Sequence, residues 1–187
     1  QVGWGYANAT SNRITFPMLS QKWALRTQTG DEDWWLFGHE LGHQFQTSDW
    51  SGGDVTEVCV NLFTMYTLNY YINNGGDNET LGFNEDGIDH EGLKASRWAT
   101  ADLFGKLQMY RQLVFEFGWD SIKQTMASYY DDSYPRDLYG DFMDGFAIRY
   151  SALVQKDLAG FFEHWEYPMS STAASKIRSL GHEQWLP

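Results

Sequence analysis

The sequence predicts a mainly α domain of the α+β class, with a small β element at its start. The chain has 187 residues, of which 42% are hydrophobic and 17% aromatic, enough for one domain with a substantial core. From Asp31 onward, apolar residues recur at helical spacing between capping residues and glycines. The first stretch instead combines aromatic and β-branched residues around a turn cluster.

The β element and two helices are expected in the first half of the chain. QVGWGYANATSNRITFP predicts a hairpin or an edge strand that ends at Pro17. The first helix is expected from Asp31 to near Thr47, because the acidic residues that open DEDWWLFGHELGHQFQ suit a helix N-terminus. The second helix is expected from Asp54 to a stop at Gly75.

Helices are expected through the second half of the chain as well. A long amphipathic helix over 92–117 should close at Gly118. Asp157 and Ser170 are good N-caps for the last two of the helices that follow. The four expected ranges are about 119–131, 138–155, 157–166 and 170–180.

Composition excludes several classes of protein. The net charge of −12 argues against a nucleic-acid partner, because binding to a nucleic-acid backbone needs clustered Lys and Arg. No run approaches the roughly 20 apolar residues of a transmembrane segment. The single cysteine, Cys59, excludes an internal disulfide and a cluster of thiolate zinc ligands, and we expect a buried, inert thiol. The oligomeric state stays open.

His39 and His43 stand four residues apart, so on a helix they offer two imidazole nitrogens to one metal ion. Glu40 would point beside that ion toward a bound water. This is the HExxH arrangement of zinc peptidases, with two ligands and a general base on one helical turn. Glu40 would activate a zinc-bound water and later return the proton to the leaving amine. The alternative is a helix that simply carries two histidines.

A catalytic zinc ion needs a third protein ligand. Asp49 stands six residues after His43, but zinc peptidases that use this position carry a glycine where this chain has Gln46. Glu57 lies on the next expected helix, and an antiparallel helix pair would return its carboxylate to the metal. Asn61, four residues later, would share that face and orient the outer N–H of a ligand histidine. Glu57 is favoured, and Asp49 is the alternative.

FGHELGHQFQ, followed by a tryptophan and by EVCVNL, resembles the enhancin-like zinc metallopeptidases, which include viral enhancins and bacterial mucin-degrading enzymes. The first stretch and DGFAIRYSALVQKDLAGFFEHWEYPMS also look like segments of that family, so the resemblance spans nearly the whole chain. It implies a single gluzincin-type zinc peptidase catalytic domain over 1–187. One zinc ion would be held by His39, His43 and Glu57, with Glu40 as the base.

The resemblance also implies a secreted or cell-surface endopeptidase that cleaves O-glycosylated, mucin-like proteins. Family members usually carry further modules upstream, so we expect a fragment of a larger multidomain protein. The alternatives are a general zinc protease or aminopeptidase without glycan dependence, and a glycan-binding module with a vestigial site.

Residues for substrate binding are less closely defined by the sequence. Most of the nine tryptophans are expected in the core, but Trp35 and Trp50 lie beside the zinc motif, where flat rings could stack on sugars. The second donor to the developing oxyanion stays open among His90, Arg149 and Tyr150.

Overall fold

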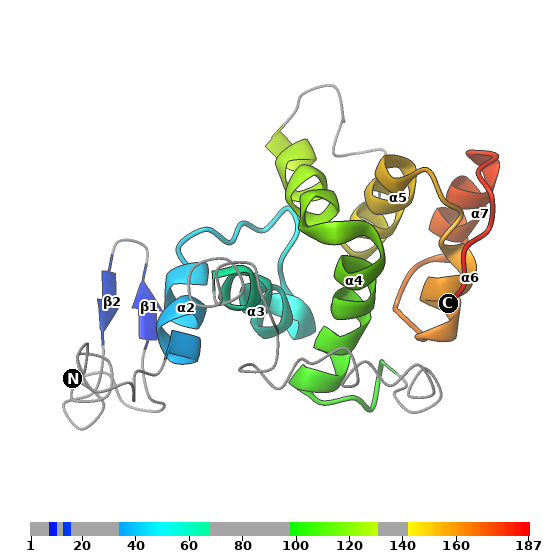
Figure 1. The fold of residues 1–187 in the computed structure, drawn as a ribbon. Coiled ribbons are helices and arrows are strands. Elements are labelled where there is room, and N and C mark those ends of the chain that lie inside the picture. Colours follow the sequence, from blue (N-terminus) through cyan, green and yellow to red (C-terminus); the bar gives the residue numbers. More distant parts are fainter. Residues whose placement is uncertain (1–7, 11–12, 16–33, 68–97, 131–141) are drawn as a thin grey trace. The chain divides into compact units, whose positions relative to one another are not determined.

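The computed structural model describes residues 8–10, 13–15, 34–67, 98–130 and 142–187 (Figure 1). These residues are mainly helical, as predicted, whereas the gluzincin-type fold stays a prediction. The helices and strands are β1 (Asn8–Thr10), β2 (Arg13–Thr15), α2 (Trp34–Gly42), η1 (Gly53–Val55), α3 (Thr56–Thr67), α4 (Leu103–Ala127), η6 (Ser128–Tyr130), α5 (Phe142–Val154), α6 (Ala159–His164) and α7 (Ser171–Ser179), where η marks a 3-10 helix. No helix of this described part is long and apolar enough to cross a membrane.

Backbone contacts divide the chain into two compact units. Unit 1 consists of Gln1–Gln46 and Asp54–Gly87, and unit 2 consists of Thr47–Gly53 and Ile88–Pro187. The chain therefore passes from unit 1 into unit 2 and back again between α2 and α3. That residues 1–187 act as one catalytic domain stays a prediction.

Unit 1 contains a short antiparallel hairpin and the helix pair α2–α3. In the hairpin, β1 pairs with β2 so that Ala9 lies opposite Ile14. Helix α2 lies beside α3 and also contacts β1 (Figure 1). The hairpin lies in the stretch whose composition predicts a β element.

The prediction that the first helix continues to near Thr47 is wrong, because α2 ends at Gly42. The chain then leaves through a tight turn, in which Phe45 N–H donates to the Gly42 carbonyl at 3.0 Å. Helix α3 begins at Thr56, two residues after the predicted start. The predicted start of the first helix and the predicted end of the second lie outside the described residues.

Two glycines of α2 allow its backbone to approach α3 closely. A Cβ atom added at Gly42 would lie 2.7 Å from Val60 Cγ2 and 3.0 Å from the Val60 carbonyl oxygen. One added at Gly38 would lie 3.1 Å from Thr64 Cα. Val60 and Thr64 are fully buried, so neither can move aside at low cost. Because neither Gly38 nor Gly42 has a side chain, α2 and α3 can pack this closely.

We expect Gly42→Ala to destabilise the protein by about 1–3 kcal/mol, because the added methyl overpacks this contact. The matched control is Gly160→Ala in α6, where the added Cβ would meet only the end of the Gln184 side chain, at 2.9 Å. Both substitutions add one methyl group to a helical glycine. Denaturant unfolding measures the stability of both variants. A Gly42→Ala unfolding midpoint at or above that of the wild type would show that the close approach of α2 to α3 does not require glycine at this position.

In unit 2, α4 is broken at Gly118, where φ is 75° and ψ is 164°. This confirms that the long helix closes at Gly118 and that another follows directly. The predicted start at residue 92 is wrong, because residues 98–100 form a turn and helical geometry begins at Leu103. Asp102 decides this boundary, since its Oδ1 accepts the Gly105 N–H at 2.7 Å.

The starts of the last two helices differ in their capping. Ser170 is the N-cap of α7, as predicted, and its Oγ accepts the Ala173 N–H at 3.1 Å. The prediction that Asp157 is the N-cap of α6 is wrong, because the helix begins at Ala159 and its N-cap is Leu158, which makes no side-chain capping bond. Asp157 lies one residue earlier, and its carboxylate accepts the Ala159 N–H at 3.0 Å. A polar side chain thus accepts one free N–H group at the start of each helix, from the N-cap position in α7 and from one residue before it in α6.

The core of unit 2 is rich in aromatic rings. Helix α5 packs against α4 and α7, and α6 packs against α7. Phe146 of α5 contacts the rings of Tyr110, Phe162 and Tyr167. Trp98 and Trp165 are also buried, in keeping with the expectation that most tryptophans are core residues. In unit 1, Cys59 is buried and forms no disulfide, as expected.

Candidate metal centre

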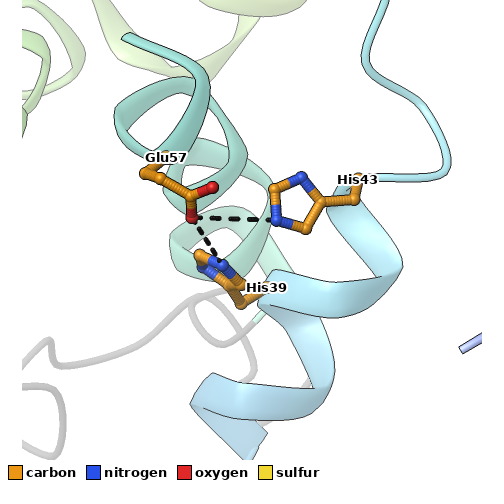
Figure 2. Close-up of side chains that lie close together, drawn as sticks. All are labelled: His39, His43 and Glu57. Carbon is orange, nitrogen blue, oxygen red and sulfur yellow. Dashed lines mark ion pairs between the residues drawn. The ribbon is translucent and has the colours of Figure 1, made fainter. Parts of the chain in front are cut away.

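Two helices of unit 1 bring His39, His43 and Glu57 together (Figure 2). Helix α2 carries His39, and His43 follows its last residue, with its backbone N–H still bonded to the His39 carbonyl at 3.2 Å. Glu57, in the first turn of α3, places Oε2 3.0 Å from His39 Nε2 and 3.7 Å from His43 Nε2. The three ligand atoms lie within 4.8 Å of one another.

The outer ring nitrogens of both histidines face amide oxygens. His39 Nδ1 lies 2.8 Å from Asn61 Oδ1, and His43 Nδ1 lies 2.6 Å from Gln46 Oε1. An amide oxygen only accepts hydrogen bonds, so each Nδ1 carries a proton and donates it. The proton on Nδ1 leaves the lone pair of each neutral ring on Nε2, which faces Glu57.

This arrangement fits a divalent cation. Two lone pairs and a carboxylate oxygen repel one another unless positive charge lies between them. Two imidazole nitrogens and one carboxylate oxygen form the donor set of His₂Glu zinc sites. Histidine ligands of such sites usually donate their outer N–H to an oxygen acceptor, as His39 and His43 do here. The donor chemistry therefore matches the metal that the sequence predicts.

Glu40 lies between the two histidines along the chain and is buried, with 6% of its surface exposed. Burial raises the pKa of its carboxyl above the ordinary value of 4.5, and the nearby imidazoles of His39 and His43 act in the opposite direction. A base works best when its pKa lies near the operating pH. The environment of Glu40 thus shifts its pKa in the direction that suits a general base.

Asp49, the alternative third ligand, lies in unit 2. In the part of the chain that the structure describes, the group of converging ligand atoms consists of His39, His43 and Glu57 without it. The helix pair therefore brings the favoured carboxylate, Glu57, to the histidines.

The structure describes no contact between the residues predicted to bind substrate and the three candidate metal ligands. Trp50 has only 3% of its surface exposed and offers no open ring face to a sugar, so its burial favours a core role. The backbone of Trp35 belongs to α2, but its side chain lies outside the described residues, as does the whole of His90.

The two other candidates for oxyanion binding have partners within unit 2. Arg149 donates from Nη1 to the Ser128 carbonyl at 2.9 Å, with its guanidinium over the Tyr129 ring. The Tyr150 hydroxyl lies 2.7 Å from Ser121 Oγ, and burial raises its pKa. These contacts favour structural roles for both residues.

Reasoning from the sequence missed the role of Gln46, which contacts a candidate ligand. Its Oε1 faces His43, and its Nε2 donates to the Thr56 carbonyl at 2.6 Å. The available signal was a polar residue three positions after a ligand histidine, where other zinc peptidases carry the turn glycine. The residue that replaces the turn glycine, Gln46, is therefore the one that contacts His43.

Comparison with known proteins identifies one family and several curated relatives. The family described as peptidase M60, enhancin and enhancin-like, matches residues 1–166. TRPM8 channel-associated factor 3 of Rattus norvegicus is 30% identical over 161 residues, or 82% of this chain. TRPM8 channel-associated factor 2 of Homo sapiens is 30% identical over 155 residues, or 80% of this chain. The chain spans 17% of the length of each of these two relatives. No solved structure matches.

Proposed function

This chain belongs to the peptidase M60 family, enhancin and enhancin-like, and on that premise we propose that it is a zinc-dependent endopeptidase. The observation that carries the proposal is the convergence of His39, His43 and Glu57, whose ligand atoms lie within 4.8 Å. The amide oxygens behind both histidines support it, because they favour the tautomer that binds a metal.

The residues around the cluster would divide the chemistry among them. Zinc, held by His39, His43 and Glu57, supplies Lewis acidity when bound, which acidifies water and polarises a carbonyl. Glu40 accepts a proton on its carboxylate, keeps it in a site shielded from solvent, and donates it to the leaving amine. Asn61 holds the ring of His39 in the orientation that turns Nε2 toward the proposed zinc site.

We propose that the substrates are O-glycosylated, mucin-like proteins outside the cell or at its surface. The support is membership of a family that includes enhancin-like peptidases, together with the resemblance of the zinc motif. The burial of Trp50 gives no support to sugar stacking at that residue, so glycan recognition would use other side chains. Cleavage without glycan dependence, by a general zinc protease or an aminopeptidase, is the alternative within the same chemistry.

Paired peptides of one sequence, bare and O-glycosylated, test the proposal with the full chain and added zinc. We expect internal cleavage of the glycosylated peptide and at least roughly tenfold slower cleavage of the bare one, a difference of about 1.4 kcal/mol in barrier. Mass spectrometry of the products gives both the rate and the cleaved bond. Equal rates would favour the general protease, and release of terminal residues would favour the aminopeptidase. Absence of cleavage of either peptide would argue against an enzyme.

A second candidate is a binding protein without catalysis, either for a membrane channel or, with a vestigial site, for glycans. The names of the relatives favour the channel, because they are called TRPM8 channel-associated factors. The presence of His39, Glu40, His43 and Glu57 in one helix pair favours the enzyme instead. Binding of a channel or glycan by a chain that cleaves neither peptide would support this second candidate.

A further inference from the structure

We propose that Gln46 is a positioning residue that connects one zinc ligand to the helix that carries another. It would hold the ring of His43 and, through Thr56, the start of α3, which bears Glu57. The inference rests on the proposed zinc site. It adds a residue that holds His43 and Glu57 in position relative to each other.

Both ends of the Gln46 side chain are engaged. Oε1 lies 2.6 Å from His43 Nδ1, and Nε2 donates to the Thr56 carbonyl at 2.6 Å. Thr56 directly precedes Glu57 in the sequence. One side chain thus reaches from the ring of one ligand to the residue before another.

The local fold explains why this residue is placed to do so. Helix α2 ends at Gly42, and the turn closed by the Phe45 N–H turns the chain before Gln46. Gln46 therefore lies beyond the helix and can reach back to His43 and across to α3. His39 is connected to α3 by Asn61, so each histidine has its own amide contact. Asn61 belongs to α3 itself, whereas Gln46 lies outside that helix and reaches it through the Thr56 carbonyl.

An amide is the group that both contacts require. The ring N–H of His43 needs an acceptor, and the Thr56 carbonyl needs a donor, so neither an apolar side chain nor a carboxylate serves both. Without the acceptor, the proton of His43 can shift to Nε2, where it blocks the lone pair that faces Glu57. Loss of such an outer contact typically lowers metal affinity about 10–100-fold.

The test measures zinc affinity of the full chain by competition with a chelator in four variants and the wild type. Gln46→Met keeps the length of the side chain and removes both polar ends. Gln46→Glu restores an acceptor for His43 but offers no donor to Thr56. Gln44→Met and Gln44→Glu make the same changes two residues earlier and serve as controls for side-chain bulk and for added charge. The absorption spectrum of the cobalt-loaded proteins reports ligand geometry independently of activity.

We expect Gln46→Met to bind zinc about 10–100-fold more weakly and to shift the cobalt bands, whereas Gln46→Glu recovers only part of that loss, because it keeps one of the two contacts. Both controls should bind like the wild type. If Gln46→Met does not fold by circular dichroism, weaker zinc binding by Gln46→Glu than by Gln44→Glu would support the role of Gln46, and equal binding would overturn it. Wild-type affinity in Gln46→Met, or equal weakness in both Gln46 variants, would overturn the role of Gln46 alone. A wild-type chain that binds no zinc would overturn the proposed function with it.

Discussion

Replacement of Glu40 by glutamine is expected to lower the rate of peptide cleavage by about 10²–10⁴-fold while zinc stays bound. The amide has the shape of the carboxyl but cannot accept the proton that must be moved. Glu40 is not among the converging ligand atoms, so the substitution leaves the donor set intact. Cleavage of the preferred peptide and zinc content, measured on the same sample, give both quantities.

Glu40→Gln is also expected to unfold at the same temperature as the wild type or at a higher one. Burial raises the pKa of Glu40, so the folded chain binds more protons there than the unfolded chain, and stability falls as pH rises through that range. Glutamine removes this cost. The control is Glu116→Gln, an exposed carboxylate of α4, which should keep full activity. Undiminished cleavage by Glu40→Gln would assign the base to another residue.

Replacement of Glu57 by alanine is the second change with a large expected effect, a loss of more than about 100-fold in zinc affinity. That loss should exceed the 10–100-fold typical of contacts outside the ligands, because a ligand itself is removed. Zinc that binds only the folded wild type adds about 2.7 kcal/mol of stability at 100 times its Kd. The increase in melting temperature on addition of zinc should therefore disappear in Glu57→Ala.

The apo forms separate this effect from misfolding. The Glu57 side chain is 56% exposed, so its removal should leave the melting temperature of the zinc-free protein nearly unchanged. Asp49→Ala is the matched control and should bind zinc like the wild type. Loss of zinc in Asp49→Ala with retention in Glu57→Ala would reverse the assignment and contradict the gluzincin site.

Much of the candidate site could be predicted because it depends on local spacing. His39 and His43 share a helical face by their separation, and Glu57 and Asn61 share the next, so pairing two helices suffices to bring the four together. Their roles toward zinc stay predictions. Gln46 could not be placed in this way, because its contacts depend on where α2 ends.

The fold was predictable where single residues decide it. The stop at Gly118 and the cap at Ser170 follow from their chemistry. The end of α2 was missed because the helical pattern of apolar residues continues past Gly42. The start of α4 was missed because nothing in the periodicity separates residues 92–102 from the helix, whereas the side-chain bond of Asp102 does. Hydrophobic spacing finds helices, but polar contacts set their bounds.

The path of the chain between the two units limits how the protein can be divided for expression. Residues 47–53 belong to unit 2, although α2 precedes them and α3 follows. They include buried Trp50 and also Gly52, where an added Cβ atom would lie 3.2 Å from the ring of Phe142 in α5. A truncation after residue 87 would keep Trp50 but remove residues 88–187, the larger part of the unit to which it belongs. A fragment that begins at residue 88 would lack Trp50 altogether. No single cut yields both units complete, so recombinant production should keep the two together.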